Sequence, residues 1–327
     1  MKMKNFAKIK MFSLLCTTLF LNLIVFATEK ISISGVSSGG YMAEQFAIAH
    51  SDLVAGLGMF SAGIPGCVRL NKLIDMHRCM KTSDQVNLQE IKMLYRAKEK
   101  SHLIAGLDSF RTMQVHLYHG QLDQTVAPSM MLLNQQLIES FGAKVSSKFI
   151  ANLAHGLPVF KAKNQCQQTA SPWLNQCEVS GALDLFGQLY SDRFNQKLDD
   201  GKWYIYQLEN ELLTDDEFNK SFLNTVLTTY VPQVCEKKDC PVHMVLHGCQ
   251  QSPEFVDEQF LLNSDFVQAA NQYSVVLFFP SVKSSSQNPY GCWDWWGYTG
   301  IHYDDQLGPQ VRVLEKIVRN KYLFLGR

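Results

Sequence analysis

The sequence predicts an α/β domain whose largely parallel sheet is flanked by helices, and three observations predict it. Apolar segments with strand character alternate with helical segments along most of the 327 residues. Hydrophobic residues make up 46% of the chain and charged residues 18%, a balance that supports a sizeable core. A Gly-x-Ser-x-Gly turn at residues 35–39 joins the first predicted strand to the first predicted helix.

Short runs that are apolar throughout or alternate between apolar and polar residues predict strands at 30–34, 53–60, 114–118, 144–150, 242–246 and 274–279. Longer segments with helical spacing predict helices at 41–49, 86–100, 129–141, 183–190, 218–227, 255–272 and 308–321. Gly35, Gly142 and Pro280 stand where elements are expected to end. The chain has no internal repeat and no Pro/Ser/Gly linker, so we expect one domain.

The first 27 residues have the pattern of a signal peptide. Four lysines precede a mostly apolar stretch at 11–26, and Val25-Phe26-Ala27 provides a cleavage site after Ala27. The apolar stretch is 16 residues long, short of the about 20 that span a bilayer, so we expect no stable membrane anchor. We therefore expect a secreted or periplasmic protein whose single domain covers residues 28–327. The 30 basic and 30 acidic residues lack the basic excess of nucleic-acid-binding proteins.

Eight cysteines follow the signal peptide. An even number of cysteines in an exported protein indicates disulfides, although eight allow 105 connectivities. Proximity in sequence favours Cys67–Cys79, Cys166–Cys177, Cys235–Cys240 and, by remainder, Cys249–Cys292. The spacings lack the C-x-x-C pairs of zinc sites, and oxidised cysteines would not serve as nucleophiles. We expect no metal.

Gly35-Val36-Ser37-Ser38-Gly39 lies directly after a predicted strand and directly before a predicted helix. This is the setting of a nucleophile elbow, in which a sharp turn exposes a serine at the carboxyl edge of the sheet. Small neighbours are needed in such a crowded turn, and the helix N-terminus behind it offers backbone N–H groups to a developing oxyanion. The motif makes Ser37 the candidate nucleophile; the alternative is a Gly/Ser-rich turn without chemistry.

A serine nucleophile needs a histidine base and an orienting carboxylate, in the chain order serine, acid, histidine. Asp123 follows the end of strand 114–118, and His155 lies in a loop after strand 144–150. These positions make Asp123 the candidate acid and His155 the candidate base. The alternatives are that Asp123 is a solvated turn residue and that His155 has a structural role in its loop. His243 and His247 flank a buried strand, where structural roles are expected. His116 and His119 would point to opposite faces of their strand and make a poor metal pair.

Only nine residues separate the predicted cleavage site from Ser37, so the strands that usually precede an elbow must come from later in the chain. Strand 242–246 runs into His247-Gly248-Cys249, a strand end of the type that supplies an oxyanion-hole N–H. The backbone N–H groups of Ser38 and Cys249 would then form the hole. The sequence thus suggests a circularly permuted hydrolase sheet.

Residues 291–298 contain three of the five tryptophans. If Cys292 pairs with Cys249, this segment lies beside the oxyanion hole, where clustered aromatic residues line an apolar substrate cleft. We select Trp293 as the candidate substrate contact and expect Trp295 and Trp296 in the core. The alternative is a packed core segment throughout.

Together, Gly35 to Met42, Gly120 to Asp123, Ala154 to Gly156, His247 to Cys249 and Gly291 to Tyr298 resemble the single-domain, circularly permuted poly(3-hydroxybutyrate) depolymerases. The resemblance spans residues 31–322. It implies an α/β-hydrolase fold and an exported carboxylic ester hydrolase acting on polyhydroxybutyrate or its oligomers. It also implies Ser37 as nucleophile, His155 as base, Asp123 as orienting acid and no cofactor. Because the chain leaves no room for a separate polymer-binding domain, we expect the catalytic domain to contact polymer itself, or the substrate to be a soluble oligomer.

Two other functions stay open at this point. The same serine chemistry would serve a secreted esterase acting on feruloyl or acetyl groups of polysaccharides. A catalytically inactive surface-binding protein that kept the fold is the alternative from another class, and the presence of Ser37, Asp123 and His155 argues against it. The sequence does not fix the oligomeric state.

Overall fold

The computed structural model describes residues 29–68, 72–195, 200–208, 212 and 214–326. The predicted signal peptide and its cleavage after Ala27 lie outside the described residues. Within these ranges, helices long and apolar enough to cross a membrane are absent.

The main sheet of the described residues has eight strands in the order β4-β3-β2-β1-β10-β11-β9-β8. The strands are β1 Ile31–Val36, β2 Val54–Phe60, β3 Gln114–Gly120, β4 Lys144–Ile150, β8 Gly201–Gln207, β9 Val226–Pro232, β10 Val242–Leu246 and β11 Val276–Phe279. Neighbours from β4 to β11 pair in parallel, and only the pairs β11–β9 and β9–β8 are antiparallel. The largely parallel sheet expected from the sequence is therefore present.

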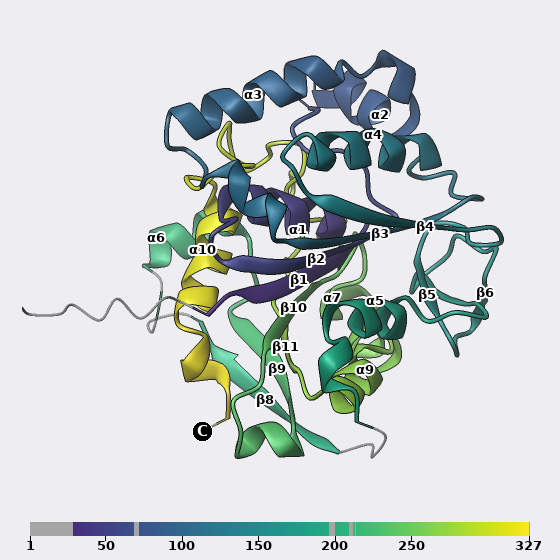
Figure 1. Ribbon diagram of the computed structural model, residues 1–327, viewed down its shortest axis with the longest axis vertical. Coiled ribbons are helices and arrows are strands. Elements are labelled where there is room, and N and C mark those ends of the chain that lie inside the picture. The colour runs from purple at the N-terminus through teal and green to yellow at the C-terminus, as the bar shows by residue number, and fades with distance from the viewer. Residues whose placement is uncertain (1–28, 69–71, 196–199, 209–211, 213, 327) are drawn as a thin grey trace, which may run out of the picture.

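Strand β1 lies at the middle of this sheet although it is the first element of the described chain. On one side it pairs with β2, and on the other with β10, where Gly35 is opposite Leu246. Strands from the second half of the chain thus complete the sheet on the β10 side, as the short segment before Ser37 predicts (Figure 1).

Helices cover both faces of the sheet, as Figure 1 shows. On one face are α1 Ser38–Ala49, α2 Lys72–Lys81, α3 Leu88–Lys100, α4 Pro128–Glu139 and α10 Pro309–Arg319, with α6 Asp215–Ser221 beside α10. On the other are α5 Gly181–Leu189, α7 Pro253–Val256, α8 Gln259–Asn263 and α9 Phe266–Tyr273. Each face has its own apolar core because both faces of the sheet are covered.

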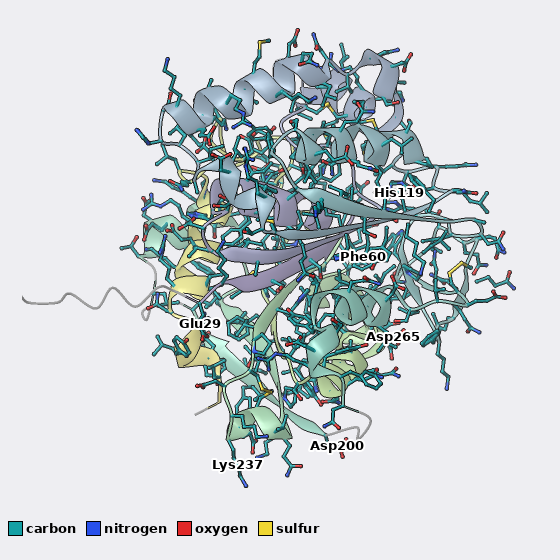
Figure 2. The ribbon with its side chains drawn as sticks, in the orientation of Figure 1. Glu29, Phe60, His119, Asp200, Lys237 and Asp265 are labelled. Carbon is teal, nitrogen blue, oxygen red and sulfur yellow. A yellow bond between two sulfur atoms is a disulfide. The ribbon has the colours of Figure 1, made fainter. Side chains whose placement is uncertain are left out.

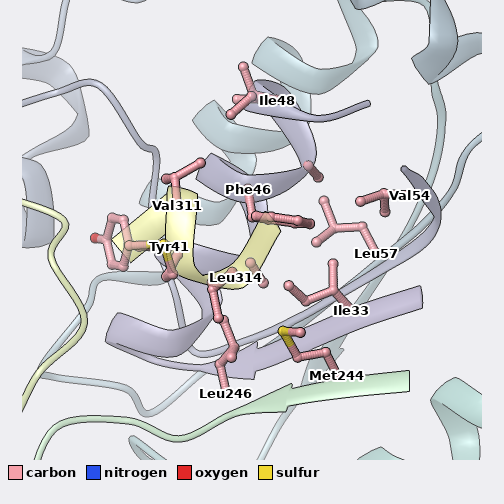
Figure 3. Packing of buried hydrophobic residues seen from close by; sticks show 14 of the residues in the cluster. Ile33, Tyr41, Phe46, Ile48, Val54, Leu57, Met244, Leu246, Val311 and Leu314 are labelled. Carbon is pink, nitrogen blue, oxygen red and sulfur yellow. The ribbon is translucent and has the colours of Figure 1, made fainter. Parts of the chain in front are cut away.

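Helix α1 is buried along its whole length, which fixes the element that carries the elbow. In Figure 3, Phe46 of α1 lies over Ile33 and Leu57 of the strands, with Val311 of α10 beside it. Each such fully buried side chain contributes about 1.5–3 kcal/mol to folding. The turn before α1 is therefore held by a rigid core.

A second, three-stranded sheet of β5 Leu157–Val159, β7 Leu174–Gln176 and β6 Asn164–Gln165 follows the loop of His155. Its strands are two or three residues long, so they have no periodicity that a sequence pattern reveals. The Cys166–Cys177 disulfide joins its loops.

Two predicted helices are wrong in extent. Residues 218–227 do not form one helix: α6 ends at Ser221, Phe222 is left-handed at φ 58°, and β9 begins at Val226. The β-branched residues of β9 favour a strand there. Segment 255–272 is interrupted at Asp257 and Asp265, with φ of 51° and 62°, and divides into three helices.

Candidate active site

Ser37 lies between β1 and α1 in a strained turn, with φ 52° and ψ −119°. Its N–H donates a hydrogen bond to the carbonyl of Phe60, 2.8 Å away, at the end of the neighbouring strand. A Cβ atom on Gly35 would lie 2.1 Å from the carbonyl oxygen of Gly39, and one on Gly39 2.4 Å from that of His247. Only glycine allows these approaches, so the Gly-x-Ser-x-Gly turn is dictated by packing.

The structure brings Ser37, His155 and Asp123 together from three separate loops. His155 Nε2 lies 3.0 Å from Ser37 Oγ, and His155 Nδ1 lies 2.8 Å from Asp123 Oδ2. Asp123 and His155 are only 4% and 5% exposed, so water competes little for these hydrogen bonds. The arrangement is that of a nucleophile, a base and an orienting acid.

Asp123 accepts four hydrogen bonds. Its Oδ1 accepts from the backbone N–H groups of Thr125 and Val126, at 2.8 and 2.9 Å. Its Oδ2 accepts from His155 and, at 3.3 Å, faces Nε2 of His119. Burial would raise the pKa of Asp123, but the hydrogen bonds from His119 and His155 outweigh burial and hold this pKa below its usual range. The carboxylate is therefore ionised at neutral pH.

Sequence reasoning missed the role of His119 as a neighbour of Asp123. His119 lies at the end of β3, at the same sheet edge as Phe60 of β2 (Figure 2). It is fully buried, and its Nε2 is also 2.9 Å from the carbonyl of Val126. The sequence feature that could have revealed this contact is the position of His119 at the end of a strand, four residues before Asp123 in the following turn.

Ser38 and Cys249, whose N–H groups are predicted to form the oxyanion hole, both lie near Ser37: Ser38 is the next residue, and Cys249 lines the same cavity. Ser38 opens helix α1, and a Cβ atom on Gly248 would lie 3.3 Å from the Cβ of Ser37. Neither N–H group donates to a protein acceptor within the described part of the chain. The Cys249–Cys292 disulfide ties this loop to the tryptophan-rich segment. The structure thus brings Ser38 and Cys249 close to Ser37, as the predicted oxyanion hole requires.

The eight cysteines pair as proximity in sequence favours: Cys67–Cys79, Cys166–Cys177, Cys235–Cys240 and Cys249–Cys292.

His243 of β10 and His247, which directly follows β10, have structural contacts, as expected. His247 is buried, its Nε2 accepts from the N–H of Val282, and burial lowers its pKa to about 4. His243 lies 2.7 Å from Ser34 Oγ, and burial lowers its pKa to about 3. Both rings are therefore neutral near neutral pH.

A cavity of about 170 Å³ opens at Ser37. It is lined by Val36, Ser37, Tyr41, Met80, Thr125, Val126, His155, Trp173, Gly248, Cys249, Gln250, Gln251 and Trp295. None of these described residues is an aspartate, glutamate, lysine or arginine. The cavity therefore favours an uncharged ligand with apolar groups.

The selection of Trp293 as a substrate contact is wrong. Its side chain is fully buried beneath the site, 5.7 Å from the ring of His247, and it does not line the cavity. Trp295 packs in the core as expected, with 5% of its surface exposed, and it also lines the cavity, where its ring stacks on Tyr41 with 4.8 Å between centroids. The two rings are separated by an irregular turn, in which the Asp294 side chain accepts the four backbone N–H groups of Trp296, Gly297, Tyr298 and Thr299.

No family model matches the chain. A poly(3-hydroxybutyrate) depolymerase of Delftia acidovorans is 27% identical over 297 residues, which cover 88% of this chain and 58% of that protein. A polyhydroxybutyrate depolymerase of Talaromyces funiculosus is 27% identical over 311 residues, covering 88% of this chain and 87% of that one. The chain is similar to poly(3-hydroxybutyrate) depolymerases.

Solved depolymerase structures have the same fold. That of the PHB depolymerase from Penicillium funiculosum superposes with a TM-score of 0.80 at 24% identity, covering 89% of this chain and 95% of that one. A PHB depolymerase complexed with R3HB trimer gives a TM-score of 0.80, covering 90% and 98%. The chain spans only 58% of the length of the Delftia depolymerase, so the likeness does not extend over that whole protein.

Proposed function

We propose that the protein is a secreted serine esterase that hydrolyses poly(3-hydroxybutyrate) or its oligomers through an acyl-enzyme on Ser37. The observation that carries the proposal is the hydrogen-bond chain from Ser37 through His155 to Asp123, at the end of a cavity without acidic or basic lining side chains other than His155. The similarity to two depolymerases over 88% of the chain supports the substrate class.

In acylation, Ser37 Oγ attacks the carbonyl carbon of an ester while His155 Nε2 takes the hydroxyl proton. The distance of 3.0 Å between these atoms is within the reach of a general base. Asp123 remains ionised, holds the Nδ1–H of His155 and stabilises the imidazolium that forms. The tetrahedral intermediate then expels the alcohol of the next ester unit, which takes the proton from His155.

The negative charge on the carbonyl oxygen of this intermediate is stabilised by the N–H groups of Ser38 and Cys249. Each donor of this kind lowers the barrier enough to change turnover by about 10²–10³. In deacylation His155 takes a proton from water, the hydroxide attacks the acyl carbon, and the 3-hydroxyacid leaves as Ser37 recovers its proton. The site thus completes the cycle with side chains and backbone groups of this chain.

The lining of the cavity favours a polyester over a sugar ester. Tyr41, Met80, Val126, Trp173 and Trp295 present mainly apolar surface to the acyl chain. A polysaccharide ester would need several polar side chains to bind its hydroxyl groups.

Export is part of the proposal. Four disulfides form in the described residues, and disulfides persist in oxidising compartments. We place signal-peptide cleavage after Ala27, with residues 28–327 forming one catalytic domain. N-terminal sequencing of the exported protein tests this point, and an intact leader would contradict it.

The activity is tested by comparing the purified protein with Ser37→Ala on an amorphous polyhydroxybutyrate suspension, a 3-hydroxybutyrate trimer and a feruloyl ester. We expect release of 3-hydroxybutyrate from polymer or trimer, reduced at least about 10³-fold in the variant. Hydrolysis of the feruloyl ester alone would assign the site to a carbohydrate esterase. No hydrolysis, together with no labelling of Ser37 by a fluorophosphonate, would indicate an inactive binding protein.

A further inference from the structure

Gln251 joins the two sides of the candidate active site through its side chain. It is buried, with 1% of its surface exposed. Its Oε1 accepts the N–H of Gly248 at 2.7 Å, and its Nε2 donates to the carbonyls of Pro172 at 2.8 Å and Trp173 at 3.4 Å. We propose that Gln251 is a positioning residue that aims the oxyanion-hole N–H of Cys249, an inference that rests on the proposed function.

Two contacts hold the carbonyl of the peptide unit between Gly248 and Cys249. The carbonyl of Gly248 accepts the backbone N–H of Gln251 at 3.3 Å and lies 2.7 Å from Nδ1 of His247. A trans peptide is planar, so its C=O and N–H point in opposite directions. Fixing the carbonyl of Gly248 therefore also fixes the direction of the Cys249 N–H.

The Gln251 side chain stabilises a strained turn in the loop after Gly248. The next residue, Gln250, is left-handed at φ 57°, which is unfavourable for a residue with a side chain. The bond from Gly248 N–H to Gln251 Oε1 closes the turn around this residue, and the N–H of Gln250 donates to Tyr290. Without the Gln251 amide, Gly248 N–H would be left buried and unpaired, and the turn would be free to relax.

Gln251 also contacts the opposite wall of the cavity, through Trp173. The Trp173 carbonyl that accepts from Gln251 also accepts the N–H of Leu157, two residues after His155. A Cβ atom on Gly156 would lie 2.7 Å from the same carbonyl oxygen. Gln251 thus links the loop of the proposed oxyanion donor to the loop that carries the proposed base, and it sets the spacing between them.

Only a neutral amide satisfies both ends. Glutamate keeps the acceptor for Gly248 but turns a carboxylate oxygen toward the carbonyls of Pro172 and Trp173. Methionine is similar in length and volume but leaves the donor of Gly248 and the acceptors of the 172–173 loop unpaired, which is costly in a buried site.

The test compares Gln251→Met and Gln251→Glu with Gln310→Met. Gln310 is an equally buried control: its Oε1 accepts the N–H of Asp294, and its Nε2 donates to the Ser221 carbonyl and the Tyr298 hydroxyl. For each purified protein, kcat and KM on a soluble butyrate ester, the inhibition constant of a trifluoromethyl ketone and the melting temperature are measured.

We expect kcat to fall about 10²-fold in Gln251→Met, with KM nearly unchanged, because the oxyanion donor is misplaced only with respect to the transition state. The trifluoromethyl ketone forms an oxyanion on the serine, so its affinity should fall in parallel. Gln310→Met should lower the melting temperature and leave kcat and the inhibition constant near those of the wild type.

A Gln251 variant that loses stability as Gln310→Met does but keeps kcat would overturn the proposal. If Gln251→Met does not fold, the same measurements are made on Gln251→Glu. This variant retains the hydrogen bond to Gly248 and breaks only the link across the cavity to residues 172 and 173. A kcat and an inhibition constant near those of the wild type would then refute that link. Failure of the wild type to hydrolyse any ester is a separate outcome that refutes the proposed function itself.

Discussion

His119 and Asp123 form a buried contact in which Nε2 of His119 lies 3.3 Å from Oδ2 of Asp123, the oxygen that also accepts from His155. One carboxylate oxygen therefore faces two imidazoles, while the other accepts two backbone N–H groups. This saturation explains how a carboxylate that burial alone would neutralise stays ionised beside the candidate base.

His119→Phe tests this contact through the pH dependence of stability. The hydrogen bonds from His119 and His155 lower the pKa of folded Asp123 below the unfolded value, so the group contributes stability that is fully present above about pH 4. This contribution is lost as the pH falls through the lowered folded pKa. The variant should bring the pKa of Asp123 closer to its unfolded value.

We therefore expect the free energy of unfolding of the wild type to be larger than that of His119→Phe. The difference should be constant from neutral pH to about pH 5 and should become smaller below about pH 4. Urea unfolding at a series of pH values measures this margin. Gln310→Met, which replaces a buried side chain that does not titrate, is the control, and a margin for His119→Phe that depends on pH no more than that of the control would rule out the role assigned to His119.

Asp123→Asn should lower kcat about 10⁴-fold while KM changes little. The amide cannot stabilise an imidazolium, and its NH₂ group would favour the wrong tautomer of His155. Steady-state kinetics on a soluble ester measure the effect. Nearly normal turnover would place the orienting acid elsewhere.

The Cys249–Cys292 disulfide closes a loop with a sequence separation of 43, against 5 for Cys235–Cys240. Loop-closure entropy predicts that replacing both cysteines of a pair by serine costs about 4 kcal/mol for the first pair and about 2 kcal/mol for the second. Because Cys249 also lies beside Ser37, only the first replacement should lower kcat. Denaturant unfolding and ester kinetics on both double variants check this, and equal turnover in the two would contradict it.

The sequence predicted Ser37, Asp123, His155 and Cys249 because each follows a strand with a recognisable local pattern. The carboxyl ends of parallel strands meet at one edge, so strand ends in the right chain order also predict proximity. Gln251 and Trp173 were missed because the hydrogen bonds from Gln251 to Pro172 and Trp173 join residues 79 and 78 positions apart, and no local pattern marks such contacts.

The strands of the second sheet were missed for a different reason. Two or three residues are too few to show a period of two, and their pairing depends on the chain path after Val159. The wrong choice of Trp293 as the cavity-lining tryptophan has a similar origin: residues 293–298 form neither helix nor strand, so periodicity does not specify which ring faces the cavity.

Trp295→Ala and Trp293→Ala should differ in their effect on substrate binding, since both side chains pack in the core but only Trp295 lines the cavity. Trp295 lines the cavity and stacks on Tyr41. Its truncation should therefore raise KM for the 3-hydroxybutyrate trimer about tenfold, because the lost apolar and aromatic contact is worth about 1.4 kcal/mol of binding free energy. Trp293 is fully buried, and its truncation should cost about 3–5 kcal/mol of stability, with KM of the folded fraction near that of the wild type. Trimer kinetics and thermal unfolding of both variants measure the two effects. The opposite pattern, a raised KM only in Trp293→Ala, would return the substrate contact to Trp293.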